Sequence, residues 1–497
     1  MKRRDFIKGA LVAGAALSGG PPRARAASPA PWGTYSSGLG HTELPVTARA
    51  KNVLEVFLVG GICPWETFYV VDHVDYGMAD GHMWWTFQEG PDSVSEWAAR
   101  CVSGAVPLLT PFEVDALGAS VQLGPFADPL RSRSDIVDRL RVLVMSHDLF
   151  PHDAARALAY TGRRIGQPQM ASVGAAVQRF EQARGSLALP ASYVISDGYD
   201  GYALQVGEHP ASCRPLGLRI QSTDTFVQNL RGIADGAHSA STQSLLTHYA
   251  GAMSARLTAP GAASRVRTPL LDAYDHALGA RLQAGAMADL LAGGDFGVVE
   301  GLTCGDPVDQ DFSRAQFRLA AHLLKHDTTR HVTVIDRAFD PLGTDPDAYD
   351  SHEQHVKESA RKLPYMWSRL IDVINEPGEG DPNKLDLDDT LVVINTEFGR
   401  SLGPQAVTGR NHYPDAYVTL MFGGPVGASQ RGIVGAIDSA GRPVGALQPA
   451  ETRAATLAAL GINPFDVGGY SSEDVNDVDT TVDAAEKLTE VVLGVPS

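Results

Sequence analysis

Cysteine is scarce in this sequence, with four residues in 497, and none of them pair as C-x-x-C. The spacing therefore excludes a zinc ribbon and a thioredoxin-like redox motif. Four cysteines in so long a chain are not a disulfide framework, so a hydrophobic core must hold the fold. In an oxidising compartment one or two disulfides could form, and the spacing leaves their pairing open. The cysteines are Cys63, Cys101, Cys213 and Cys304.

An excess of positive charge and long apolar runs are also missing. Lys and Arg number 41 against 58 Asp and Glu, a formal net charge of −17. Nucleic acid and anionic lipid repel so acidic a chain, so we expect no nucleic-acid partner. No apolar run approaches the roughly 20 residues that cross a bilayer, so no integral membrane segment is expected in the mature chain. The motifs G-x-S-x-G, H-E-x-x-H and Walker A are absent.

The first residues are typical of an export signal. Arg3 and Arg4 precede Phe6, a short apolar stretch covers residues 10–18, and residues 24–26 read Ala-Arg-Ala. A charged region, an apolar region and an A-x-A site are the parts of a signal peptide, and paired arginines favour the twin-arginine type. An ordinary secretory signal and a basic tail are the alternatives. We expect residues 1–26 to be removed and the mature chain to be periplasmic or extracellular.

Apolar runs alternate with helical patterns along the mature chain. Two segments, 315–326 and 353–374, have apolar residues at helical spacing. Strands that alternate with helices predict an α/β fold with a mostly parallel central sheet flanked by helices. Residues from about 165 to 300 are expected to form a helical insertion or cap within a single domain over 27–497, because residues 239–291 are Ala/Leu-rich and helical in period. The five expected strands are residues 53–59, 140–145, 331–335, 390–395 and 417–422.

Polar residues with catalytic or metal-binding capability follow these expected strands. In an open parallel sheet, ligands bind outside the carboxyl ends of the strands, which makes this placement informative. The residues are His147 and His152 after the second strand, Asp350, His352 and His355 after the third, Glu397 and Arg400 after the fourth, and His412 shortly before the fifth. Carboxylate and imidazole ligands suit Zn²⁺, Mn²⁺ or Fe. A divalent metal site is therefore predicted at this edge.

Each of these residues also has an ordinary structural explanation. Asp350 could cap a helix, and Glu397 could form a salt bridge with Arg400. One of His147 and His152 is expected to be structural. Cys63 could be a nucleophile or a metal ligand, although a cysteine at a strand end is more often a small buried side chain.

Five stretches of the chain resemble a secreted bacterial family known as domain of unknown function 1501, in the alkaline phosphatase/sulfatase superfamily. They are residues 56–61, 146–162, 349–354, 396–400 and 409–412, in the order that the family has. The resemblance implies an alkaline-phosphatase-like α/β fold, whose strand ends hold metal in the hydrolytic members. The family itself has no settled activity.

The superfamily comparison also assigns roles to single residues. Sulfatases carry Cys-x-Pro-x-Arg before Ala-Ala-Leu-Leu-Thr-Gly, and here residues 152–162 read His-Asp-Ala-Ala-Arg-Ala-Leu-Ala-Tyr-Thr-Gly. The nucleophile position falls on His152 and the sulfatase arginine on Arg156, so a formylglycine mechanism is disfavoured. Phe398 occupies a place where hydrolytic relatives often have a metal-binding histidine. The expectation is one metal, held by Asp350, His352, Glu397 and His412.

Three functions remain open at this stage. The first is an exported metal-dependent hydrolase of phosphate or sulfate esters, acting on a small-molecule or glycan substrate. In it His152 would be a general base, an extra ligand or a nitrogen nucleophile, and Arg156 would hold an anionic group. The second is a non-catalytic binding or envelope protein on the same fold. The third is a redox or transfer activity that uses a single metal.

Overall fold

The computed structural model begins its description at Glu43, so the predicted signal peptide over residues 1–26 lies outside the described residues. The described residues are 43–71, 94–102, 109–184, 192–196, 201–209, 213–218, 223–235, 240–257, 284–294, 296, 300–304, 306–308, 311–326, 329–337, 349–405, 409–466 and 469–496. The chain divides into two compact units. The smaller comprises residues 1–29, 210–213 and 223–293, and the larger comprises the remainder.

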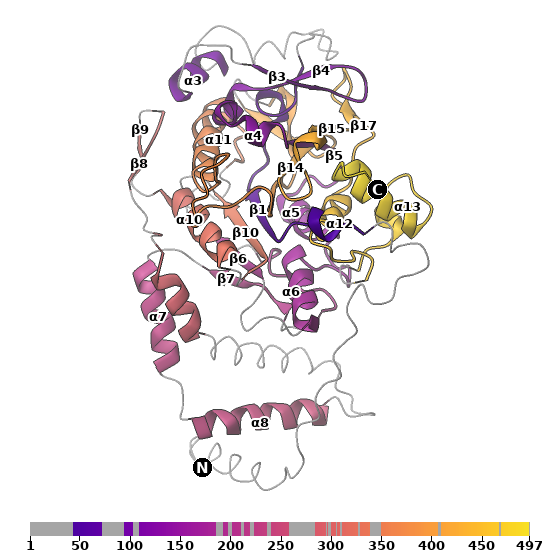
Figure 1. Ribbon diagram of the computed structural model, residues 1–497. Helices are drawn as coiled ribbons and strands as arrows, with labels where there is room; N and C mark the ends of the chain where they lie inside the picture. The colour runs from indigo at the N-terminus through magenta and orange to yellow at the C-terminus, as the bar shows by residue number, and fades with distance from the viewer. Residues whose placement is uncertain are drawn as a thin grey trace. The chain divides into compact units, whose positions relative to one another are not determined.

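An eight-stranded, mostly parallel sheet forms the centre of the larger unit (Figure 1). Its strand order is β15-β5-β14-β11-β1-β10-β6-β7. All five strands that the apolar runs predict belong to it, as β1, β5, β10, β11 and β14. The bounds are β1 Asn52–Leu58, β5 Arg141–Met145, β6 Ser192–Ser196, β7 Leu216–Leu218, β10 His331–Asp336, β11 Thr390–Thr396, β14 Tyr417–Phe422 and β15 Gly432–Val434.

Strand β14 runs antiparallel to both of its neighbours, unlike the other strands of this sheet. The chain passes from β11 to β14 through the hairpin of β12, Gly399–Pro404, and β13, Arg410–Tyr413. Two parallel strands need a connection that returns to the opposite end of the sheet, usually through a helix. This link contains no helix among its described residues, so β14 starts where β11 ends and runs back. One antiparallel strand is compatible with the mostly parallel sheet that the sequence predicts.

Helices cover both faces of the sheet in the larger unit. Val53 and Leu391 pack in one cluster with Val177 of α6 and Leu457 of α12. Asn52, on the other face of β1, donates a hydrogen bond to the carbonyl of Leu324 in α10. Alternate residues of a strand face opposite sides, so α10 lies across the sheet from α12. The bounds are α3 Val94–Cys101, α4 Ser134–Val137, α5 His152–Thr161, α6 Val173–Arg184, α10 Phe312–Lys325, α11 His355–Ile371, α12 Pro449–Ala459 and α13 Thr481–Glu486.

Short strands outside the main sheet form small hairpins and ribbons. The strands β2, β4 and β3 form a three-stranded sheet, and β8 with β9 and β16 with β17 form two-stranded ones. Their bounds are β2 Val70–Val71, β3 Thr110–Val114, β4 Ser120–Leu123, β8 Gly301–Thr303, β9 Asp306–Val308, β16 Ala436–Ile437 and β17 Pro443–Val444.

The smaller unit is helical in its described residues. It contains α7, Thr223–Asp235, and α8, Ala240–Leu257, together with a helix over residues 284–292. These helices lie inside the range from about 165 to 300 that the sequence assigns to a helical insertion. The same range also contains α6, β6 and β7, which belong to the larger unit, and the two strands extend its central sheet.

One disulfide joins Cys101, at the end of α3, to Cys304, which follows β8. Cys63 and Cys213 are buried and lie outside this disulfide. The pairing that the spacing left open is thus between the second and fourth cysteines. Cys63 therefore keeps its thiol at the end of β1.

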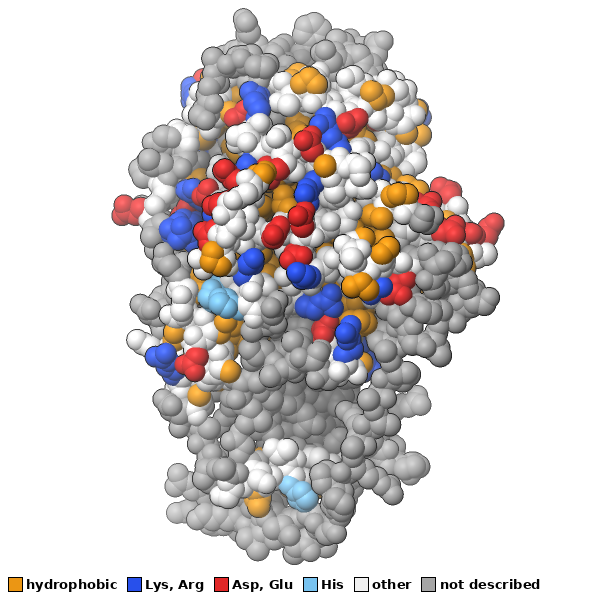
Figure 2. Space-filling model, in the orientation of Figure 1, with side chains coloured by type: hydrophobic (Ala, Val, Ile, Leu, Met, Phe, Trp, Pro, Cys, Tyr) orange, Lys and Arg blue, Asp and Glu red, His pale blue; other side chains and the backbone are white. Residues whose placement is uncertain are grey.

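Acidic and basic side chains are interspersed on the face of the molecule drawn in Figure 2. Several form exposed ion pairs, such as Lys51 with Asp389, whose Nζ and Oδ2 atoms are 2.6 Å apart. Exposed pairs of this kind contribute about 1 kcal/mol or less. A buried ion pair lies in the core, where Arg453 of α12 donates to Glu55 in the middle of β1.

Candidate metal centre

Three histidines converge on Asp350 at the carboxyl ends of the central strands. His152 is the first residue of α5, and His412 lies in β13. Asp350 and His352 come from the segment that precedes α11. One nitrogen or oxygen atom from each of these residues lies within 4.8 Å of those of the others. We call His152, Asp350, His352 and His412 the histidine–aspartate cluster.

The Nδ1 atom of each histidine is already engaged by an oxygen acceptor. His152 Nδ1 is 2.8 Å from Glu397 Oε1, and His412 Nδ1 is 2.9 Å from the carbonyl oxygen of Phe150. His352 Nδ1 is 2.5 Å from Gln405 Oε1. An oxygen acceptor on Nδ1 fixes the proton there and turns Nε2 toward the cluster. Histidines that bind metals in proteins are held in this way.

The Nε2 atoms meet at the carboxylate of Asp350. His352 Nε2 is 3.0 Å and His412 Nε2 is 3.4 Å from Asp350 Oδ1, and the two Nε2 atoms are 3.0 Å apart. With protons on both Nδ1 atoms, two Nε2 lone pairs and a carboxylate oxygen face one another. Such a contact is repulsive unless a cation or an added proton lies between the atoms. The three atoms are therefore better placed to bind a divalent cation than to contact one another directly.

His152 lies on the other oxygen of the same carboxylate. Its Nε2 atom is 2.9 Å from Asp350 Oδ2. Burial would lower the pKa of His152, but contacts with Asp350 and Glu397 outweigh it and raise the pKa to about 9. A protonated His152 donates from Nδ1 to Glu397 and forms an ion pair through Nε2 with Asp350, so in this structure it bridges two carboxylates.

Asp350 is held in place by a buried arginine. Arg400 is fully buried and donates to Asp350 Oδ1 as well as to the carbonyl of Gly60. Burial acts to raise the pKa of Asp350, but His152, His412 and Arg400 lower it far more, so the carboxyl group stays ionised. The sequence suggested Glu397 as a partner for Arg400, whereas the structure pairs Arg400 with Asp350.

Glu397 does not lie among the ligand atoms of the cluster. It is fully buried at the end of β11, and its Oε1 atom accepts from the backbone N–H of Gly60 at 2.8 Å as well as from His152. In this structure Glu397, predicted as a metal ligand, contacts His152 and not the ligand atoms of the cluster. The reason is local, because the Gly60 N–H and His152, at the start of α5, both bind its carboxylate.

Phe398 forms a wall of the cluster. Its ring stacks on His412 with centroids 4.4 Å apart and contacts His152 with centroids 4.8 Å apart. Gly61 allows this packing, since a Cβ atom there would lie 2.7 Å from Phe398 Cδ2. An apolar ring next to Glu397 offers no ligand for a second metal on this side of the cluster.

The other predicted site residues take different positions. Arg156 follows His152 by one turn of α5, and its Nη2 atom is 2.5 Å from Asp153 Oδ1. His147 donates from Nε2 to the carbonyl of Glu397 at 2.7 Å and accepts from Leu149 N–H at Nδ1, so it is the structural member of the His147/His152 pair. His355 is fully buried, and burial together with nearby arginines lowers its pKa well below the usual range.

The cluster is open to solvent on one side. The side chain of His352 is 35% exposed, against 10% for Asp350. A metal held by these residues would keep a position that a substrate or water can reach, as catalytic metal sites do. Sequence reasoning missed Gln405 and the Phe150 carbonyl, since neither a loop amide nor a backbone oxygen carries a signal in the sequence.

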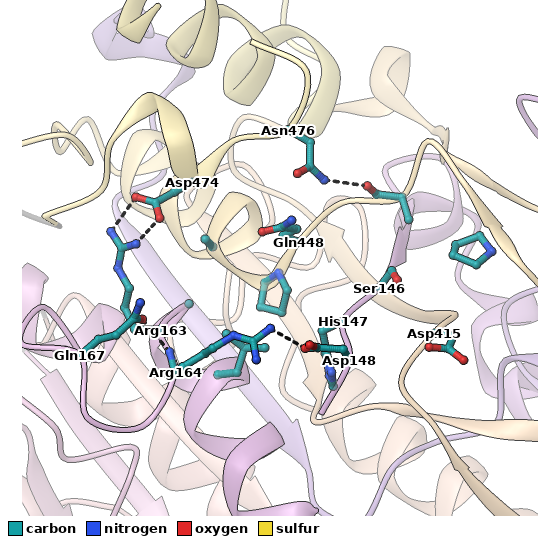
Figure 3. A pocket seen from close by; sticks show the side chains of 16 residues that line it. Ser146, His147, Asp148, Arg163, Arg164, Gln167, Asp415, Gln448, Asp474 and Asn476 are labelled. Carbon is teal, nitrogen blue, oxygen red and sulfur yellow. Dashed lines mark hydrogen bonds and ion pairs between the residues drawn. The ribbon is translucent and has the colours of Figure 1, made fainter. Parts of the chain in front are cut away.

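A polar pocket of about 570 Å³ lies at the carboxyl end of β5 (Figure 3). His147 lines it and contacts Glu397, which places the pocket next to the cluster. Its two arginines are neutralised by carboxylates, Arg163 by Asp474 and Arg164 by Asp148. The pocket therefore presents paired charges and amide groups rather than a strong field of one sign.

Gly60 lies against the backbone of Asp350 and donates its N–H to Glu397, so a substitution there tests how tightly the cluster is packed. It has φ of +112°, and a Cβ atom there would lie 2.2 Å from the backbone nitrogen of Asp350. Gly60→Ala is expected to cost about 3 kcal/mol of unfolding free energy, from backbone strain and the displaced segment. Gly118, with φ of +81° and open space around it, is the matched control. Gly118→Ala should cost only about 1 kcal/mol in urea denaturation, and equal losses would contradict the close-approach argument.

Comparison with known families now identifies the chain. A family model described as "Protein of unknown function (DUF1501)" matches residues 50–473. The chain belongs to this family. No curated protein and no solved structure gives a significant match to it. Among the described residues, none of the helices has the length and apolar character that a membrane crossing requires.

Proposed function

We propose that this protein is a metal-dependent hydrolase of phosphate or sulfate esters. Asp350, His352 and His412 would hold one divalent cation, Zn²⁺, Mn²⁺ or Fe. The observation that carries the proposal is the convergence of two Nε2 atoms on Asp350 Oδ1, at 3.0 and 3.4 Å, while both Nδ1 atoms are committed elsewhere. Two histidines and one carboxylate with an open position are a common catalytic ligand set.

A bound cation would polarise an ester oxygen and lower the pKa of a water molecule. The residues of the chain would orient the metal ligand and supply the proton. Arg400 keeps Asp350 ionised and oriented, and Glu397 with Gly60 N–H fixes the ring of His152. His152 carries its proton 2.9 Å from Asp350 Oδ2, where it can donate to a leaving group beside the cation.

The remaining parts of the proposal rest on the sequence. The resemblance to the alkaline phosphatase/sulfatase superfamily supports an alkaline-phosphatase-like arrangement and an anionic ester substrate, for which Arg156 is the candidate anion-binding residue. The mostly parallel sheet with polar residues at its strand ends supports the same assignment. The paired arginines Arg3 and Arg4 support export by the twin-arginine route to the periplasm or beyond.

A non-catalytic metal- or glycan-binding protein is the second candidate. Both nitrogens of His152 contact carboxylates, and Phe398 occupies the position beside Glu397. No cysteine, serine or threonine stands at the position that corresponds to the sulfatase nucleophile. A protein with these features could retain the metal and lack turnover.

Metal content tests the proposal directly. The full chain is purified without chelator, and Zn, Mn and Fe are counted per chain by elemental mass spectrometry. The variant Asp350→Ala/His352→Ala is expected to lose the metal of the histidine–aspartate cluster, while Glu353→Ala, an exposed neighbour in the same segment, should keep it. Release of nitrophenol from p-nitrophenyl phosphate and p-nitrophenyl sulfate then separates the two candidates. Retention of all metal by the double variant would exclude the proposed ligands.

A further inference from the structure

A second group of metal-binding residue types lies near the first. It consists of Cys63, Glu66 and His355, with one sulfur, oxygen or nitrogen atom of each within 4.8 Å of the others. We call it the cysteine cluster. Cys63 precedes the short 3-10 helix Pro64–Glu66, Glu66 is the last residue of that helix, and His355 is the first residue of α11. All three side chains are fully buried.

The carboxylate of Glu66 is only half satisfied by the protein. Arg410, also fully buried, donates to Oε1. The buried Oε2 atom accepts no hydrogen bond from a nitrogen or oxygen donor in the described part of the chain. The Cys63 thiol, a weak donor, hydrogen-bonds this carboxylate. A cation bound by the Cys63 thiolate and by Oε2 would satisfy the buried carboxylate more strongly than the thiol does.

Burial excludes the nucleophilic role considered for Cys63. Its side chain has no exposed area, and burial raises the pKa of the thiol well above the usual range, although Arg410 acts in the opposite direction. A reactive cysteine needs an accessible thiolate. The alternative from the sequence, that Cys63 is a metal ligand, is compatible with full burial.

We propose that Cys63, Glu66 and His355 bind a second divalent cation, of the Zn²⁺ type, with a structural role. A thiolate, an imidazole and a carboxylate are zinc ligands, and a thiolate selects zinc over magnesium or calcium. On binding, the thiol proton leaves to solvent and a metal–sulfur bond forms. The thiolate and carboxylate then neutralise the dication. Arg410 also donates to the carbonyls of Ser401 and Leu402, so its own charge keeps polar partners.

This second cation would stabilise the segment that carries the first site. Ser351 lies between Asp350 and His352, and its Oγ atom is 2.8 Å from His355 Nδ1. The other ring nitrogen, Nε2, is 3.2 Å from Ser359 Oγ, and the cation would replace this contact. Fixing His355 therefore fixes the backbone of two residues in the histidine–aspartate cluster. The proposal does not depend on hydrolase activity, because it concerns different ligands.

Cobalt absorption tests the cysteine cluster separately from the first site. The full chain is produced in medium supplemented with Co²⁺, so that the metal enters during folding. A thiolate-to-cobalt charge-transfer band in the near ultraviolet is expected in the wild type. The band should persist in His352→Ala/His412→Ala, which lacks only the first site. Cys63→Ser should lose it, and Cys213→Ser, the matched buried cysteine, should keep it.

Two results would overturn the proposal. One is a cobalt-loaded wild type without the charge-transfer band, and the other is a band that Cys213→Ser removes while Cys63→Ser does not. If Cys63→Ser fails to fold, X-ray absorption at the cobalt edge of the wild type replaces it, with one sulfur in the first shell as the expected result. A shell of nitrogen and oxygen alone would count against the cluster.

Discussion

His152→Ala is expected to reduce ester hydrolysis by a factor of roughly 10² to 10⁴ while the metal remains bound. The reason is geometric. Asp350 Oδ1, His352 and His412 form the ligand triangle, whereas His152 contacts Asp350 Oδ2 from outside it. Removing His152 deletes a proton donor but leaves the three ligands. The measurement is kcat for the nitrophenyl ester that the wild type hydrolyses, at saturating metal, with metal content determined on the same sample.

The comparison with a supporting residue sharpens this prediction. Glu397→Gln keeps the size of the side chain that holds His152 and is expected to lower kcat less than His152→Ala does. Complete loss of metal from His152→Ala would make His152 a fourth ligand instead of a proton donor. Unchanged hydrolysis would remove His152 from the mechanism. Hydrolysis that also survived loss of the metal ligands would exclude the histidine–aspartate cluster as its site.

The sequence predicted the sheet and the place of the site for clear physical reasons. Strands such as Asn52–Leu58 and Thr390–Thr396 are buried along their whole length, so they appear as continuous apolar runs. The carboxyl ends of parallel strands meet at one edge, so Asp350, His352 and His412 could be assigned to one site. Their proximity in the structure agrees with that assignment.

The direction of individual side chains could not be predicted in the same way. Glu397 and His412 both follow or precede apolar strands, yet the carboxylate of Glu397 turns toward Gly60 N–H and His152. The sequence near Glu397 does not encode that choice, because the donors are Gly60, just after β1, and His152 of α5, both more than 200 residues away in the chain. The partner of Arg400 is Asp350 for the same reason, since both meet only after β1, β10 and β11 pair.

The sequence pattern also could not predict the direction of β14 or the presence of the short strand β7. Tyr417–Phe422 has the apolar character of a buried strand whichever way it runs, and only the hairpin before it reverses it. Strand β7 has three residues, too few to give a periodic signal. The helical character of the surrounding region therefore dominated the interpretation of residues 165–300.

Glu55→Leu is expected to destabilise the larger unit by about 3–5 kcal/mol, because it leaves Arg453 buried without its carboxylate. Glu55 is 3% exposed and Arg453 is fully buried. Burial alone would raise the pKa of Glu55, but Arg453 and His331 lower it to about 2. The measurement is the shift in the urea midpoint at pH 7. Lys51→Ala, which breaks the exposed pair with Asp389, should cost about 1 kcal/mol or less.

The pH dependence tests the same pair independently. The pKa of Glu55 in the folded protein, about 2, lies below the ordinary glutamate value of 4.5. Ionised Glu55 therefore contributes stability that is fully present above about pH 5 and is lost as the pH falls toward 2. The difference in stability between wild type and Glu55→Leu should shrink by roughly half between pH 7 and pH 3. The double variant Glu55→Leu/Arg453→Met should recover most of the loss at pH 7, because two apolar side chains can fill the space of a buried ion pair. A double variant less stable than the sum of the single ones would mean that α12 needs the ion pair to dock on β1.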